Sequence, residues 1–214
     1  MEILKFTQKE WMTEDTKTVK GGLHRISYGV VDSPVVIVHK KSQVDEAVCA
    51  ELGYGIVESF CNGGTVVVNK GDLLLGHFYK PQNGWCDRFV SYFVDWLKSK
   101  GLNAERDNND VLVDGYKVCG TGITSHGRID YTSVFIAINT NLDHIKAICK
   151  KAMEKVPKGL SEYGITTDEA EQMFLDFCEQ DKQTEEAVKK PATDPEERYI
   201  PDWKALEIIL GGEV

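Results

Sequence analysis

The chain has 214 residues, of which 42% are hydrophobic and 28% are charged, and it carries a formal net charge of −9. This composition supports a folded core and argues against extensive disorder. The acidic balance, with no basic cluster longer than two lysines, argues against a nucleic-acid partner. No apolar run approaches the roughly 18 residues of a membrane span, so no membrane partner is expected.

The cysteines and histidines limit the chemistry further. The six cysteines include no C-x-x-C pair, and their spacing resembles no disulfide scaffold. Together with the lack of a secretory signal, this predicts a cytoplasmic protein in a reducing compartment. The five histidines show no metal-ligand spacing, so no metal site is expected.

Apolar patterning in the first hundred residues predicts several strands, one hairpin and two helices. Ser42 is expected to cap the first helix, with Asp45 at the capping-box position. Asn69, Lys70 and Gly71 form a short turn between two apolar runs, which predicts a hairpin. The expected elements are strands over 3–6, 33–39, 55–60, 65–68 and 72–79, and helices over 42–52 and 85–101.

The second half of the chain predicts another hairpin and further helices. Asp114 and Gly115 form a tight turn between apolar runs at 109–113 and 116–123. Thr166 and Glu169 have the spacing of a capping box at the start of a helix. The remaining expected elements are a strand over 131–142 and helices over 143–156, 166–180 and 201–210.

These elements predict an α+β fold with a mixed, largely antiparallel sheet and flanking amphipathic helices, because a regular βαβ alternation is missing. Residues 1–180 are expected to form one domain. Residues 181–198 are rich in charge and poor in apolar residues, which is typical of a linker. Residues 199–214 are expected to form a short C-terminal helix.

Two glycine-rich segments are the strongest candidates for a site. The first is residues 62–65, Asn62, Gly63, Gly64 and Thr65, followed by Gly71 and Asp72. The second contains Lys117, Cys119, Gly120, Thr121 and Gly122. Glycine-rich loops leave backbone N–H groups accessible to a ligand, and a neighbouring lysine can act as a point charge for an oxyanion or phosphate. The simpler alternative is that these glycines only make turns and that the lysine is solvated.

The same two segments resemble the lipoate–protein ligase, octanoyltransferase and biotin ligase superfamily. Residues 58–66 align with the ligase motif R-R-x-S-G-G-G-x-V, and Gly71 and Asp72 fall at a following G-N position. Residues 115–122 are similar to the motif D-x-K-[IV]-S-G-S-A. Residues 139–142 match the asparagine- and leucine-containing segment that leads into a helix. The resemblance spans roughly residues 33–155, and it implies a biotin/lipoate ligase-like domain.

The resemblance implies that Lys117 is the central catalytic residue, which binds the acyl carbonyl and, in the ligases, the phosphate of an acyl-adenylate. It further implies an acyl group, lipoate or octanoate, with ATP as a candidate cosubstrate, and transfer to a lysine of an acyl-carrier or lipoyl-domain protein. The implied substrate-binding residues are Asn62, Gly63, Gly64, Thr65, Gly71, Asp72, Gly120, Thr121 and Gly122.

Departures from the family pattern leave a second interpretation open. Glu58 and Ser59 replace the paired arginines, and residues 132–135 replace an H-H-G-T segment, with Phe135 at its last position. These changes suit a catalytically silent member that binds an acyl group, a nucleotide or a protein partner. A biotin ligase ranks last, because the G-R-G-x-x-G-R loop of those enzymes is missing.

Three cysteines require comparison as nucleophiles. Cys119 is two residues from Lys117, so strand alternation places both on one face, where the ammonium would favour a thiolate. Cys149 is nearest in chain order to the family's acyl-carrier cysteine, but it falls on the inward face of a predicted helix. Cys61 replaces a family serine. A packing role is the alternative for all three.

Overall fold

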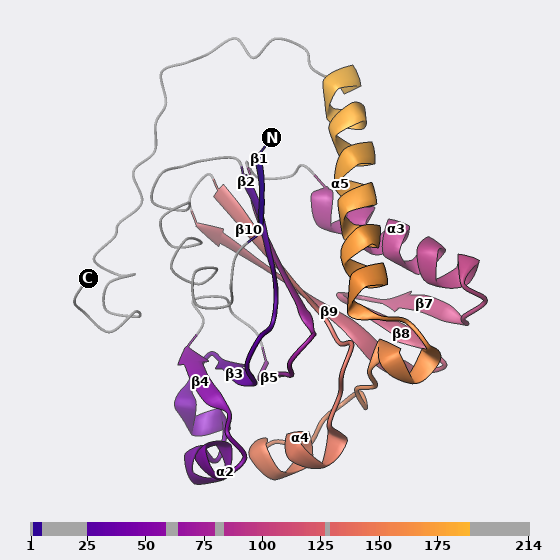
Figure 1. Ribbon diagram of the computed structural model, residues 1–214. Coiled ribbons are helices and arrows are strands. Elements are labelled where there is room, and N and C mark those ends of the chain that lie inside the picture. Colours follow the sequence, from indigo (N-terminus) through magenta and orange to yellow (C-terminus); the bar gives the residue numbers. More distant parts are fainter. Residues whose placement is uncertain (1, 6–24, 59–63, 80–83, 127–128, 189–214) are drawn as a thin grey trace.

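Two β-sheets form the framework of the protein (Figure 1). The computed structural model describes residues 2–5, 25–58, 64–79, 84–126 and 129–188. The larger sheet has the strand order β1-β2-β6-β10-β9-β8-β7, and the smaller sheet has the order β4-β3-β5. Only the β1–β2 and β3–β4 pairs are parallel among the described strands, so the predicted α+β fold with a largely antiparallel, mixed sheet is confirmed.

The strands and helices of the described chain have the following bounds. The strands are β1 Glu2–Lys5, β2 Arg25–Val30, β3 Val35–Val38, β4 Gly55–Glu58, β5 Val66–Val68, β6 Leu73–Tyr79, β7 Ala104–Asp107, β8 Asp110–Val113, β9 Tyr116–His126 and β10 Ile129–Ile136. The helices are α2 Glu46–Glu51, α3 Trp85–Ser99, α4 Leu142–Ile148 and α5 Thr167–Val188, with 3-10 turns η1 Lys41–Gln43 and η2 Leu160–Tyr163.

Helices α3 and α5 lie on one face of the larger sheet and enclose the main core (Figure 1). The apolar face predicted for α3 is the buried one, and Phe89, Phe93 and Leu97 are fully buried there. Trp85 stacks on Phe89 with ring centroids 5.4 Å apart. Aromatic burial on this scale supplies much of the hydrophobic stabilisation of a domain.

The opposite face of the larger sheet meets the smaller sheet, which explains why the first three residues of β6, Leu73 to Leu75, are all apolar. Leu73 and Leu75 point to the helices, whereas Leu74 points to the smaller sheet. A strand that is buried on both faces has no solvent side on which polar residues would alternate. The smaller sheet is covered on its far side by α2 and α4.

The predicted hairpin between 65–68 and 72–79 is wrong. Strand β5 pairs with β3 in the smaller sheet, and β6 pairs with β2 and β10 in the larger one. The turn therefore carries the chain from one sheet to the other. By contrast, the predicted hairpin at Asp114 and Gly115 is confirmed, with φ angles of 52° and 81° between β8 and β9.

Helix boundaries differ from the predictions at three places. Helix α4 ends at Ile148 rather than 156, because Lys150 N–H bonds to the Gln43 carbonyl and the chain turns away. Asp45, rather than Ser42, caps α2 by accepting bonds from two backbone N–H groups. Helix α5 begins at the predicted capping box of Thr166 but continues to Val188.

The extension of α5 shortens the predicted linker. Asp181, the first residue of that segment, is buried and forms two bonds with Arg88 of α3 at 2.6 and 3.1 Å. Residues 189–198 and the predicted C-terminal helix lie outside the described residues, so the division into domain, linker and helix stays a prediction. Across the described ranges, no helix combines the length and the apolarity needed to cross a bilayer.

Candidate active site

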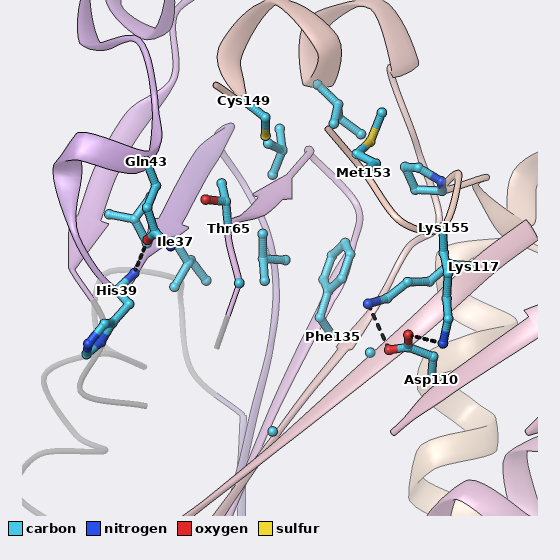
Figure 2. A pocket seen from close by; sticks show the side chains of 18 of the residues that line it. Ile37, His39, Gln43, Thr65, Asp110, Lys117, Phe135, Cys149, Met153 and Lys155 are labelled. Carbon is cyan, nitrogen blue, oxygen red and sulfur yellow. Dashed lines mark hydrogen bonds and ion pairs between the residues drawn. The ribbon is translucent and has the colours of Figure 1, made fainter. Parts of the chain in front are cut away.

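A cavity of about 920 Å³ lies between the two sheets (Figure 2). Strands β3 and β5 form one wall, and β9 and β10 form the other. The segment 149–157, which follows α4, closes one side. The volume is within the usual range for small-molecule sites, roughly 300–1,000 Å³.

Lys117 and its ion pairs form the polar end of this cavity (Figure 2). Its Nζ lies 2.8 Å from Oδ1 of Asp110 on the neighbouring strand. The other Asp110 oxygen, Oδ2, lies 2.8 Å from Nζ of Lys155, which also contacts Asp107 Oδ2 at 2.8 Å. Two lysines and two aspartates therefore form one continuous network beside the cavity.

The charges of this network reinforce one another. Burial alone would raise the pKa of Asp110, but hydrogen bonds and charge from Lys117 and Lys155 outweigh burial and hold that pKa below its usual value. The hydrogen bonds that Lys155 donates to Asp107 and Asp110 raise the pKa of Lys155. Asp110 therefore stays ionised and Lys155 stays protonated at neutral pH.

The predicted position of Cys119 is wrong because β9 contains a bulge. Val111 pairs with Cys119 but the next residue, Leu112, pairs with Lys117, so Val118 is an extra residue on β9. The bulge turns the side chains of Val118 and Cys119 into the main core, so that both residues border the cavity without sharing the face of Lys117. Burial raises the pKa of the Cys119 thiol, which is the opposite of the lowering expected from a neighbouring ammonium.

The glycines of the second segment do face the cavity. A Cβ on Gly120 would lie 3.0 and 3.1 Å from Cε and Nζ of Lys117, so the lysine side chain lies across this glycine. A Cβ on Gly122 would lie 3.0 Å from Ser133 Oγ on β10. Thr121 also lines the cavity, although its hydroxyl donates to the Asn109 carbonyl at 2.9 Å.

The first glycine segment reaches the same cavity from the smaller sheet. Gly64 and Thr65 both line it, and Figure 2 shows Thr65 on the wall opposite Lys117. A Cβ on Gly64 would meet nothing within 4 Å, so the space beside it is open. Asn62 and Gly63 lie outside the described residues. The predicted convergence of the two segments on one cavity thus holds for Gly64 and Thr65.

Gly71 and Asp72 have a structural position, away from the cavity lining. Gly71 has a φ of +89° in the turn between the sheets, and its Cβ would meet the Asn139 side chain at 2.6 Å. Asp72 is fully buried and accepts three bonds from the backbone N–H groups of Asn69, Ile138 and Asn139. The carboxylate therefore fixes the crossing between sheets, where the motif had suggested a substrate contact.

Two of the departures from the family motifs lie in the cavity wall. Glu58, at the position of a family arginine, is exposed at the end of β4 and lines the cavity. Phe135 projects from β10 between Thr65 and Lys117 (Figure 2). Phe135 pairs across the strands with Gly120, which has no side chain to occupy that space.

The remaining cysteines fall into two groups. Cys149 follows the last residue of α4, is half-buried and lines the cavity, and burial raises the pKa of its thiol. Cys86 and Cys178 are buried in the main core. Cys61 lies outside the described residues.

Sequence reasoning missed Lys155. The predicted helix over 143–156 would have left this residue at its end, whereas the structure shows an irregular segment that returns to β9. Lys117 N–H donates to the Val156 carbonyl at 2.9 Å, and Lys158 N–H donates to the Lys117 carbonyl at 3.0 Å. These bonds connect residues about forty positions apart, and no local pattern predicts them.

Similar folds occur in solved structures of lipoate ligases. The bipartite lipoate protein ligase of Thermoplasma acidophilum, studied with its E2 lipoyl domain, is 15% identical, with a TM-score of 0.68 over 82% of this chain and 80% of the other. P. falciparum LipL1, in complex with lipoate, is 15% identical with a TM-score of 0.68, over 90% of this chain and 64% of the other. Lipoate-protein ligase A bound with ATP is 15% identical with a TM-score of 0.66, over 82% of this chain and 81% of the other. At such low sequence identity, the structural similarity shows that these proteins share the fold of this chain.

The search of curated proteins gives no match. The sequence itself matches the model of the lipoyl protein ligase A/B catalytic domain over residues 6–180. This range includes the smaller sheet, the larger sheet except β1, the cavity and Lys117. The chain therefore belongs to the lipoyl protein ligase A/B catalytic domain family.

Proposed function

We propose that this chain binds an acyl group of the lipoate or octanoate kind in the cavity and transfers it to a lysine of a lipoyl-domain carrier protein. The observation that carries the proposal is the position of Lys117 at the polar end of a cavity between two sheets. One solved structure of similar fold is described in complex with lipoate, and another is described together with its E2 lipoyl domain.

In the proposed reaction, the carrier amine attacks the acyl carbonyl carbon. The new C–N bond forms as the bond to the leaving group breaks, and the leaving group departs with its electron pair. The proton lost from the amine goes to the leaving group or to solvent. The Lys117 ammonium stabilises the negative charge that develops on the carbonyl oxygen, a role that is strongest in a site shielded from water.

The donor that we propose is an acyl group already activated as an ester or thioester. Among the described lining residues there are four lysines (117, 150, 151 and 155) and three acids (58, 110 and 154), so the lining is almost balanced in charge. A triphosphate would be better matched by a clear excess of cations. ATP-dependent activation of the free acid is the competing route, since a ligase of this fold binds ATP.

A silent acyl-binding protein is the second candidate function. One observation favours it: Glu58 lines the cavity at the position of a family arginine and would repel an anionic substrate. The two candidates share the ligand but differ in turnover, so a direct transfer assay separates them.

The test is acyl transfer to a lipoyl domain, followed by intact mass of the carrier, with octanoyl thioester in one arm and octanoate plus ATP in the other. Lys117→Ala should lower the rate on the order of 10²–10³-fold, the usual cost of losing an oxyanion partner. Lys98→Ala is the matched control, because this lysine is exposed on α3 and lies outside the cavity lining. Octanoate binding without turnover in either arm would support the silent alternative. Turnover that survives Lys117→Ala would exclude both.

A further inference from the structure

Asp110 shares its carboxylate between two lysines, one oxygen to each. Oδ1 faces Lys117 Nζ and Oδ2 faces Lys155 Nζ, both at 2.8 Å. The carboxylate is mostly shielded from solvent, with 17% of the side chain exposed, so water screens these contacts only in part. Each oxygen of the Asp110 carboxylate therefore has its own charged partner.

The two lysines differ in how many donors remain. An ammonium has three N–H donors. Lys155 meets three acceptors, namely Asp110 Oδ2, Asp107 Oδ2 and, at 3.4 Å, the Asp107 carbonyl. Lys117 meets one acceptor among the described residues, Asp110 Oδ1. Lys155 is thus saturated, whereas Lys117 keeps two donors for a ligand in the cavity.

We infer that Asp110 is a positioning residue that aims the Lys117 ammonium into the cavity, and that Lys155 holds the second oxygen of Asp110 so that the carboxylate does not take up Lys117's remaining donors. This inference deepens the proposed function and rests on it for the reaction step. Neither Asp110 nor Lys155 needs to touch the acyl group for this role.

The surrounding backbone supports the arrangement. Lys117 is bonded on both sides to the segment that carries Lys155, through the Val156 carbonyl and the Lys158 N–H. The Lys117 side chain extends across Gly120, since a Cβ on this glycine would lie 3.0 Å from Lys117 Cε. These contacts fix the Lys117 backbone. The ammonium can then either pair with Asp110 or point into the cavity.

Removing either partner should lower transfer for opposite reasons. In Lys155→Met, Asp110 is free to turn both oxygens toward Lys117 and to draw the ammonium out of the cavity. In Asp110→Asn, the amide cannot satisfy both lysines, because its nitrogen is a donor. Misplacing a catalytic group by about 1 Å costs about 10²-fold in rate, so we expect each variant to lower kcat at least tenfold.

The kinetic experiment compares these variants with Lys98→Met as control, an exposed lysine of α3 outside the cavity lining, and with Lys155→Arg as rescue, on the acyl donor that the wild type uses. We expect kcat to fall in Lys155→Met while KM for the donor stays within about twofold. Arginine should restore most of kcat, because a guanidinium can bind two carboxylates. A parallel loss in kcat, KM and thermal stability, without rescue by arginine, would mean a purely structural role and would overturn the inference.

A second measurement does not depend on turnover. Acetic anhydride labelling of Lys117 in the free protein, read by peptide mass spectrometry, reports how strongly its amine is held. Relative to wild type, Asp110→Asn should label Lys117 at least threefold faster, and Lys155→Met should label it at least threefold slower. Equal or same-sign changes in the two variants would overturn the inference. If labelling follows this pattern and transfer is absent, the proposed function fails while the shared carboxylate stands.

Discussion

Asp72 offers a test of how a buried carboxylate joins the two sheets. Its Oδ1 accepts bonds from the N–H groups of Ile138 and Asn139 at 2.7 and 2.8 Å, and its Oδ2 accepts one from Asn69 at 2.7 Å. In Asp72→Asn, the amide oxygen can keep two of these bonds, but the amide nitrogen would face the Asn69 N–H. One buried donor left unsatisfied costs about 1–3 kcal/mol.

The charge of Asp72 acts in the opposite direction. Burial raises the pKa of Asp72 to about 7, even though hydrogen bonds from three backbone N–H groups and from the Asn69 side chain oppose that rise. The unfolded chain has a pKa of about 3.9, so between pH 4 and 7 the native protein binds more protons than the unfolded one. Stability from this group is complete below pH 4 and falls as the pH rises to 7. About 3 pH units at about 1.4 kcal/mol each give a loss of about 4 kcal/mol as an upper bound.

These two magnitudes predict that the stability curves cross. At pH 5 Asp72→Asn should be less stable than wild type by about 1–3 kcal/mol. At pH 8 the wild type has lost up to about 4 kcal/mol of stability, which exceeds the cost of the unsatisfied donor. The variant should therefore be at least as stable as the wild type at this pH. Urea unfolding followed by tryptophan fluorescence from pH 4.5 to 8 measures both curves, and the difference between them isolates Asp72.

The opposite result would refute this reasoning. If the wild type keeps its stability between pH 4 and 7 and the variant is less stable throughout, the three N–H bonds outweigh burial. Octanoate binding gives an independent control, because Asp72 lies outside the cavity lining. Loss of binding with unchanged stability curves would return Asp72 to the role that its motif position had suggested.

Two further substitutions test the site and the helix packing. Gly120→Ala should displace the Lys117 side chain and lower acyl transfer about tenfold or more, whereas Gly55→Ala, whose Cβ would meet only a Val35 methyl at 3.9 Å, should leave transfer unchanged in the same assay. Arg88→Met should lower the free energy of unfolding by about 2 kcal/mol in urea, because it leaves the Asp181 carboxylate buried without its arginine; a change below about 0.5 kcal/mol would contradict this.

Local chemistry predicted those parts of the fold that depend on few neighbours. The apolar stripe of α3 and the Asp114-Gly115 turn were readable because helix periodicity and left-handed turn residues act within a few positions. The position of Lys117 was predicted from the family resemblance, because the glycine spacing alone left a solvated lysine as the simpler alternative. In the structure, Gly120 leaves the space into which this side chain extends.

Long-range pairing decided the parts that could not be predicted. The sequence of the turn at Gly71 is typical of a hairpin, but β5 pairs with β3 and therefore does not pair with β6. The one-residue bulge at Val118 reverses the face of Cys119, and alternation alone gives no sign of it. Lys155 reaches the site only because backbone bonds to Lys117 override the helical pattern around it.

Phe135 is the residue that we expect to limit the size of the acyl group. Its ring projects into the cavity between Thr65 and the Lys117 end (Figure 2), and the side chain packs against the cluster between the sheets that includes Leu74. An acyl chain whose carbonyl lies at Lys117 and whose tail runs toward the smaller sheet must pass this ring. The ring therefore sets the space available beside the acyl chain.

Phe135→Ala removes the ring while keeping the β10 backbone that pairs with Gly120. We expect the ratio of kcat/KM for a decanoyl over an octanoyl donor to rise at least fivefold, with Phe135→Leu intermediate. The cost in stability should be about 1–2 kcal/mol, less than the about 3–5 kcal/mol of a fully buried phenylalanine, because this side chain is only half-buried. If the protein is a silent binder, the same ratio is read from dissociation constants of the free acids. An unchanged chain-length preference in both readouts would show that the acyl tail does not pass Phe135 and would place it elsewhere in the cavity.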